Sequence, residues 1–484
     1  MEQAAQTSQD SPRYQLIIDG QRAEAASGRR YDTVDPYQQR AWASAADGDA
    51  ADVDLALAAA RRALSGPWGQ LTGFGRAALL RRLAELIARD ADRLAAIETR
   101  DTGKLLREMR GQLASLPSWY SYFAGLADKL QGETIPTDRA NFLVYTRHEP
   151  AGVVGAIVPW NSPLLLLSWK LAPALAAGCT VVAKPSDYSP ASAVELAGLF
   201  DEAGFPPGVF NVVTGFGPAV GKALAGHPGV DKVAFTGSTG VGAEVAKAAA
   251  ANITGALLEL GGKSAHLVFA DADLDAASNG VVAGVFAATG QTCMAGSRLL
   301  VHRSVHDALV DRIVRRAETI RIGDPQDPAT EMGPLATEPQ FRKVLSFFGS
   351  AAAEGATLAT GGPSAPLDRG FFVRPTVFAA VRPESTIAQE EIFGPVLSVI
   401  PYRSEAEAVE IANGTSYGLS GAVFAGEQDR AVAFARRLRT GQVMVNGGAF
   451  NPVAPFGGYK QSGIGRELGR YGLEEFLEVK SLQL

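Results

Sequence analysis

Residues 153–161 read VVGAIVPWN, and this stretch decides the fold because a nearly unbroken apolar run ends in a proline, a tryptophan and an asparagine. Similar runs follow at helix-length intervals, at 180–183, 209–213, 232–235 and 257–260. Short apolar runs that alternate with helical segments are typical of parallel strands covered by helices on both faces. The pattern predicts a doubly wound α/β unit, preceded by an amphipathic helix over Arg76–Ile97.

A second series of strands and helices follows the glycine pair at 261–262, the expected joint between two α/β units. It includes apolar runs at 298–302 and 396–402 and a helix near 306–320. Residues 132–150 and 474–484 differ from both units, because they read as strands with little core of their own. We expect these two stretches to pair in an assembly sheet.

Composition excludes several classes of protein. The chain has 484 residues, 20% of them charged, with a net charge of -6, so neither disorder nor nucleic-acid binding is expected. Met1–Asp10 carries no signal or transit pattern, and Lys170, Pro173 and Gly178 interrupt the most apolar segment, so we expect a cytoplasmic protein that does not enter membranes. Two cysteines and five histidines build no disulfide framework, and no metal site is expected.

Cys293 is the candidate nucleophile, in the segment GQTCMAGSR at 290–298. A free cysteine is most often a small buried hydrophobe, and Cys179 fits that interpretation. Cys293 differs because its small neighbours leave room for a substrate. A helix-like turn after it is expected to lower the pKa of the thiol.

Two polar residues close predicted strands. Glu259 either pairs with Lys263 or caps a turn, or it acts as a general base whose pKa is raised by its apolar strand. Asn161 is either an ordinary turn residue or the donor that stabilises an oxyanion.

Three loops are candidates for binding a nucleotide. The loop from Gly237 to Gly242 exposes backbone N–H groups at a helix N-terminus, but it is not G-x-G-x-x-G because Thr239 stands at the second glycine. The loop containing Gly217 is a weaker candidate, since Pro218 is typical of a helix start. Lys184 and Asp187 either lie in solvent or hold the two hydroxyls of a ribose.

Together and in this order, the segments resemble the aldehyde dehydrogenase superfamily from about Tyr31 to the C-terminus. The matching motifs are PWN at 159–161, KPS at 184–186, FTGS at 235–238, ELGGK at 259–263, GQTC at 290–293, EIFGPV at 391–396 and PFGGYKQSG at 455–463.

The resemblance implies two Rossmann-like doubly wound parallel-sheet domains plus a small β oligomerisation element. The expected NAD(P)-binding domain covers 1–131 and 151–260, the catalytic domain 261–450, and the oligomerisation sheet 132–150 and 470–484. It further implies a homodimer or homotetramer that oxidises a small aldehyde with NAD. NADP is an alternative, because Asp187 stands where many NAD-preferring members carry glutamate.

The resemblance also assigns roles. Cys293 attacks the aldehyde, Asn161 receives the oxyanion, Glu259 activates water for thioester hydrolysis, and Glu467 relays protons. The implied cofactor residues are Pro159, Trp160, Lys184, Ser186, Asp187, Gly217, Gly237, Ser238, Gly242, Leu260, Glu391 and Phe393. The implied substrate residues are Ser162, Leu166, Trp169, Thr292, Met294, Phe450 and Phe456.

The mostly apolar substrate set favours an uncharged aliphatic or aromatic aldehyde or a catabolic semialdehyde, and Ser162 predicts a wider mouth than the aromatic residue of many relatives. One alternative is a CoA-acylating aldehyde dehydrogenase, which generally lacks the carboxylate of Glu259. The other is a catalytically silent structural homologue, which intact Cys293, Glu259 and Asn161 disfavour.

Overall fold

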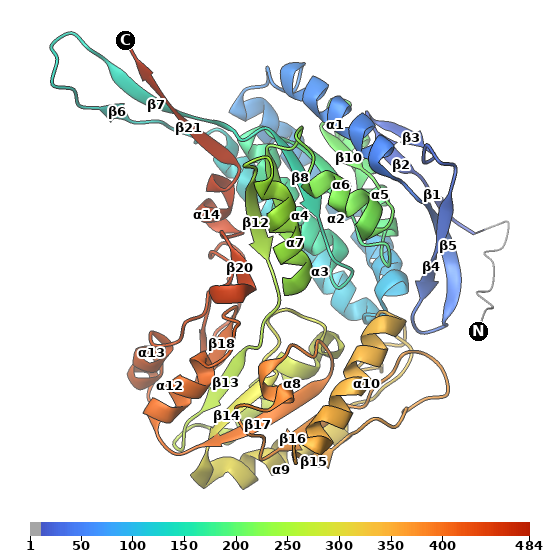
Figure 1. The fold of residues 1–484 in the computed structure, drawn as a ribbon, viewed down its shortest axis with the longest axis vertical. Coiled ribbons are helices and arrows are strands. Elements are labelled where there is room, and N and C mark those ends of the chain that lie inside the picture. The colour runs from blue at the N-terminus through green and yellow to red at the C-terminus, as the bar shows by residue number, and fades with distance from the viewer. Residues whose placement is uncertain (1–10) are drawn as a thin grey trace.

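The computed structural model describes residues 11–484, and the expectation that Met1–Asp10 carries no targeting signal lies outside them. Figure 1 shows two α/β units and a narrow sheet that projects from one of them. The predicted fold class is confirmed, since each unit is built on a mainly parallel sheet. Within residues 11–484, no helix is both long and apolar enough to cross a membrane.

The first unit contains an eight-stranded sheet in the order β20-β12-β11-β8-β9-β10-β2-β3. Its five central strands run parallel, and all five coincide with the predicted apolar runs. The strands are β8 (Val153–Ile157), β9 (Thr180–Lys184), β10 (Phe210–Val212), β11 (Lys232–Thr236), β12 (Gly255–Glu259), and the antiparallel edges β2 (Leu16–Ile18), β3 (Gln21–Ala23) and β20 (Gly463–Ile464).

Helices cover both faces of this sheet, which explains why its strands are apolar throughout. Side chains alternate along β8, so Val154 and Ala156 join the core beneath α2–α5, while Val153 and Ile157 join the core beneath α1, α6 and α7. The helices are α1 (Ala50–Ser65), α2 (Gly73–Thr102), α3 (Leu106–Ala127), α4 (Pro163–Ala177), α5 (Ala191–Ala203), a π-helical turn (Gly217–Gly221) that leads into α6 (Lys222–Ala225), and α7 (Thr239–Ala250).

The helix predicted over Arg76–Ile97 is confirmed as part of α2. It starts earlier because the side chain of Thr72 accepts a hydrogen bond from Gly75 N, and it ends at Gly103, whose φ of 73° is in the left-handed region.

The chain enters the second unit at Gly261–Gly262, between β12 and β13. Its seven-stranded sheet has the order β15-β16-β17-β14-β13-β18-β19, and only β15 is antiparallel to its neighbour. The strands are β13 (Ala265–Val268), β14 (Arg298–His302), β15 (Thr357–Thr360), β16 (Thr376–Ala379), β17 (Val396–Tyr402), β18 (Gly421–Phe424) and β19 (Met444–Val445). The helices are α8 (Leu274–Phe286), α9 (His306–Glu318), α10 (Glu338–Ala353), α11 (Thr386–Gln389), α12 (Glu405–Asn413) and α13 (Gln428–Ala435), with 3-10 turns at Ala287–Gly290, Arg303–Val305 and Lys460–Ser462.

The projecting sheet brings together stretches far apart in the sequence. β7 (Val144–Pro150) pairs antiparallel with β21 (Leu477–Gln483), which follows α14 (Gly469–Glu474), and β6 (Thr134–Ile135) forms its other edge (Figure 1). Most of its side chains are at least partly exposed, Val479 at 64%.

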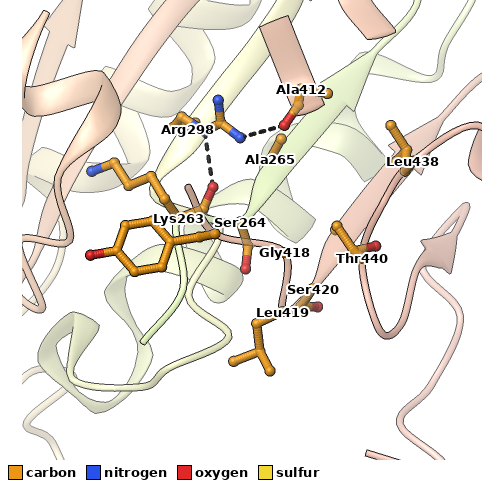
Figure 2. A pocket seen from close by; sticks show the side chains of 12 residues that line it. Lys263, Ser264, Ala265, Arg298, Ala412, Gly418, Leu419, Ser420, Leu438 and Thr440 are labelled. Carbon is orange, nitrogen blue, oxygen red and sulfur yellow. Dashed lines mark hydrogen bonds between the residues drawn. The ribbon is translucent and has the colours of Figure 1, made fainter. Parts of the chain in front are cut away.

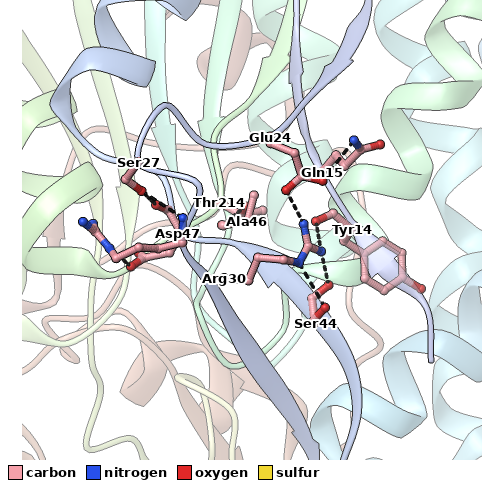
Figure 3. Close-up of polar contacts among 10 residues, drawn as sticks. Tyr14, Gln15, Glu24, Ser27, Arg30, Ser44, Ala46, Asp47 and Thr214 are labelled. Carbon is pink, nitrogen blue, oxygen red and sulfur yellow. Dashed lines mark hydrogen bonds and ion pairs between the residues drawn. The ribbon is translucent and has the colours of Figure 1, made fainter. Parts of the chain in front are cut away.

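A small N-terminal sheet escaped the sequence analysis, because its strands are short or mostly polar. β5 (Arg40–Ala46) lies between β1 (Arg13–Tyr14) and β4 (Arg30–Asp35). Arg30 fixes this sheet, since its guanidinium donates to the carbonyls of Tyr14 and Ser44 and pairs with Glu24 (Figure 3).

Candidate active site

Cys293 lies on the loop between the 3-10 turn Ala287–Gly290 and β14. Ala288, Thr289 and Gly290 have φ values of 51°, 58° and 70°, so three successive residues adopt left-handed backbone. This is costly for a β-branched threonine, and such strain gathers at functional sites. Two contacts hold the loop: Ala288 N donates to Glu108, and Thr289 Oγ1 donates to the carbonyl of Gly333.

The expected lowering of the Cys293 pKa is wrong. Burial and, to a smaller extent, the carboxylates of Glu391 and Glu259 together raise the pKa of the thiol to about 12. No helix begins after Cys293, because the next regular element is β14. Formation of a thiolate therefore needs a neighbouring base or cation. Cys179, by contrast, is a fully buried thiol as predicted.

Asn161 follows the carboxyl end of β8 and lines the same cleft as Cys293. Its side chain is held in place, because Nδ2 donates to the carbonyl of Gln291 at 3.0 Å, two residues before the cysteine. The neighbouring Ser162 is buried, and its hydroxyl accepts from Lys104 Nζ at 2.9 Å. Sequence reasoning missed Lys104.

Glu259 is the last residue of β12 and is buried, with neither carboxylate oxygen hydrogen-bonded to any described residue. Burial raises its pKa well above the ordinary range, and Glu467 raises it further. Glu259 forms no ion pair with Lys263, so the alternative that these two side chains pair with each other is wrong. Lys263 is itself buried, and its carbonyl accepts a hydrogen bond from Arg298 (Figure 2).

A buried ion pair lies behind Glu259. Lys170 Nζ is 2.7 Å from Glu467 Oε1 and donates to Thr236 Oγ1 at 2.6 Å, and both charged side chains are fully buried. Sequence reasoning missed Lys170 and Thr236. The signal was a single lysine in the apolar segment that forms α4, since a buried charge requires a partner.

A cleft with about 620 Å³ of open space lies between the two sheets and in front of Cys293. Seven predicted cofactor residues line it: Pro159, Trp160, Gly237, Ser238, Leu260, Glu391 and Phe393. Trp160 and Phe393 meet edge to face at 5.5 Å. Gln340 and Lys343 also line the cleft and were missed, although Gln340 Nε2 donates to the carbonyl of Phe393 at 2.8 Å.

The carboxylate of Glu391 lies against the glycine pair at 261–262. Glu391 Oε1 accepts from Gly262 N at 2.9 Å, and a Cβ on Gly261 would lie 2.4 Å from Glu391 Oε2. The glycine pair therefore allows the carboxylate to approach the loop closely.

Residues predicted for the other end of the cofactor lie at or just beyond the carboxyl ends of the parallel strands β9, β10 and β11 of the first sheet. Lys184 Nζ is 3.6 Å from Asp187 Oδ1 just beyond β9, and Ser186 Oγ accepts from Tyr188 N. Ser238 is the N-cap of α7, and Gly217 begins the π-helical turn. Gly242 of α7 packs against Leu260, which lines the cleft, and a Cβ there would lie 2.3 Å from Leu260 Cδ2.

The predicted substrate residues include an aromatic group. Trp169 contacts Phe456 at 5.0 Å and Phe450 at 6.3 Å, measured between ring centroids. Trp119 of α3 completes the group at 5.8 Å from Trp169 and was missed by sequence reasoning. Leu166 lines the cleft beside Cys293, while Thr292 and Met294 flank the cysteine in sequence and remain partly exposed.

Comparison with known proteins agrees with this arrangement. The family model described as "Aldehyde dehydrogenase family" matches residues 23–482. The chain belongs to the aldehyde dehydrogenase family. It is 47% identical over 474 residues to mouse retinaldehyde dehydrogenase 3, a match that covers 97% of this chain and 92% of that protein.

Two solved structures share the fold of this aldehyde dehydrogenase. Betaine aldehyde dehydrogenase from Staphylococcus aureus in complex with NAD+ superposes with a TM-score of 0.95 at 41% identity, covering 97% of this chain and 94% of that one. The NAD+ complex of an aldehyde dehydrogenase from Bacillus cereus has a TM-score of 0.95 at 43% identity, covering 98% and 96%.

Proposed function

We propose that this enzyme oxidises an uncharged aliphatic or aromatic aldehyde, or a catabolic semialdehyde, to the carboxylic acid through a thioester on Cys293. The observation that carries the proposal is one cleft that Cys293 and Asn161 share, with Glu259 buried at the end of the adjoining strand. Glu259 favours transfer of the acyl group to water over transfer to coenzyme A.

In the first step, Cys293 Sγ adds to the aldehyde carbon and forms a tetrahedral thiohemiacetal. The Asn161 amide is suited to hold the new oxyanion, since its orientation is already fixed by Gln291. A fixed donor of this kind is worth about 10²- to 10³-fold in rate. The thiol proton must leave for this step, and the nearby Glu259 is a carboxylate able to accept it.

Oxidation of the adduct leaves an acyl group on Cys293, which water then hydrolyses. Burial raises the pKa of Glu259, so this carboxylate is a stronger base than an exposed one. The Lys170–Glu467 pair behind it supports a route by which the proton leaves the closed site.

The residues around the cleft fit a nicotinamide dinucleotide, which when bound accepts the hydride that the adduct loses. Glu391 and Phe393 would hold the nicotinamide ribose, the α7 N-terminus at Ser238 the pyrophosphate, and Lys184 with Asp187 the adenine ribose. The shorter Asp187 side chain supports use of NADP+ as well as NAD+. The named relatives in complex with NAD+ support the same assignment.

We further propose that β21, β7 and β6 form the contact between subunits of a homodimer or homotetramer, since these strands expose an unpaired edge and little core. A cytoplasmic location suits an enzyme that depends on a reduced thiol, and both cysteines are free.

The test is a screen of NAD+ and NADP+ reduction across aldehydes of increasing length and with aromatic or carboxylate ends. The proposal predicts turnover with apolar aldehydes that Cys293→Ala abolishes, while Cys179→Ala leaves turnover intact. Turnover that persists in Cys293→Ala would contradict it, as would a preference for phosphorylated aldehydes.

A further inference from the structure

Lys104 is a buried lysine on the catalytic side of the first unit. It occupies the turn between α2 and α3, and its side chain is 2% exposed. Its ammonium has no ion-pair partner within 4.0 Å among residues 11–484. It donates a hydrogen bond to Ser162 Oγ at 2.9 Å. Burying a cation that is held by one neutral hydroxyl costs free energy of folding. We therefore expect the charge of Lys104 to have a role in the site.

The hydroxyl of Ser162 connects Lys104 with Asn161, the proposed oxyanion donor. Ser162 Oγ donates to the backbone carbonyl of Asn161 at 2.7 Å, while the side-chain amide of Asn161 donates to the backbone carbonyl of Gln291. Lys104 and Ser162 therefore hold the backbone of Asn161, and the side chain of Asn161 is held by the loop of Cys293. A phenylalanine or tryptophan at position 162 would offer Lys104 no hydroxyl.

The same turn also supports the strained side of the cysteine loop. Glu108, one helical turn after Lys104, accepts from Ala288 N at 3.1 Å. A Cβ on Gly103 would lie 2.7 Å from Pro334 Cγ, and Pro334 and Gly333 in turn accept hydrogen bonds from Gln291 and Thr289. Residues 103–108 therefore contact both the cysteine loop, at Ala288, and the segment Gly333–Pro334 that accepts hydrogen bonds from that loop.

We propose that Lys104 is a positioning residue for aldehyde oxidation, which orients Asn161 through Ser162 and whose positive charge favours the thiolate of Cys293 and the oxyanion. The inference rests on the proposed roles of Cys293 and Asn161. Glu391 and Glu259 both oppose ionisation of the Cys293 thiol, so a cation that favours the thiolate is needed. Lys343 lines the same cleft as Cys293, whereas Lys104 lies beside Ser162. Burial lowers the pKa of Lys104, whereas Glu108 on α3, Glu98 on α2 and the Cys293 thiolate act in the opposite direction and favour its charged form.

The test measures the rate of inactivation by iodoacetamide against pH in the intact enzyme, which gives the apparent pKa of Cys293. Lys104→Met is expected to raise that pKa by about one unit, the shift that a unit charge roughly 12 Å away causes at an effective dielectric constant near 20. Lys104→Arg keeps the charge and should keep the parent pKa. Ser162→Ala should leave the pKa unchanged and lower kcat roughly tenfold, the size expected when one hydrogen bond that orients a catalytic donor is lost.

Lys129→Met, which removes an exposed charge just beyond α3, is the matched control and should alter neither quantity. An unchanged alkylation pKa in Lys104→Met, even with lower activity, would overturn the inference and leave Lys104 a structural residue. If Lys104→Met does not fold, a raised pKa in Lys104→Arg or normal kcat in Ser162→Ala overturns it instead. Failure of the proposed function would look different, since Cys293→Ala would then stay active.

Discussion

Breaking the buried Lys170–Glu467 pair should cost far more stability than breaking a pair at the surface. At 2.7 Å and an effective dielectric constant of 20, the gross attraction is about 6 kcal/mol. Glu467→Gln leaves Lys170 buried without a counter-charge, so we expect a loss of about 3–5 kcal/mol. Glu474→Gln on the neighbouring α14 is the control, because its partner Arg470 is exposed and the loss should stay below about 1 kcal/mol.

Urea unfolding of Glu467→Gln, Lys170→Met and the double variant measures these losses under identical conditions. The double variant should lose much less than the sum of the single variants, because neither charge is then left alone. The Glu467→Gln variant should also lower the pKa of Glu259, since Glu467 raises it, and the acid limb of the kcat profile should move to lower pH. Losses no larger than that of Glu474→Gln, or an unmoved acid limb, would refute the reasoning.

Two further outcomes follow from the packing of the site. Gly261→Ala should raise the KM for the cofactor at least tenfold, because its Cβ would lie 2.4 Å from Glu391 Oε2, whereas Gly198→Ala has open space and should match the parent; equal KM values would refute this. Burial raises the pKa of Glu98 to about 7, so its contribution to stability is full below about pH 4.5 and is lost as pH rises through 7. Relative to the parent, Glu98→Gln should gain about 2–3 kcal/mol between pH 5 and pH 8 in urea unfolding, and a constant difference would contradict the assignment.

The parallel strands were predictable because strands buried on both faces must be apolar over their whole length. β8, β9 and β11 therefore stand out in the sequence, and the motifs at their carboxyl ends lead directly to Asn161 and the loop of Ser238. The strands of the N-terminal sheet are short or mostly polar, so they carry no such pattern. Arg30 stabilises this sheet by donating hydrogen bonds to the carbonyls of Tyr14 and Ser44.

Residues that act through partners distant in sequence were not predictable. Lys170 and Glu467 are 297 positions apart, and Lys104 and Ser162 are 58 apart, so no local spacing relates them. The pKa of Cys293 was predicted in the wrong direction for the same reason. Its value depends on burial and on carboxylates brought in from two other segments, whereas the local sequence suggested only a helical turn.

The covalent state of Cys293 in the Glu259→Gln variant tests the central claim most directly. After mixing with NAD+ and an apolar aldehyde, mass analysis of the peptide that contains Cys293 should show the acyl group, with one reduced cofactor formed per active site and little further turnover. An unmodified Cys293 during continued turnover, or an acyl group on any other residue, would contradict the account.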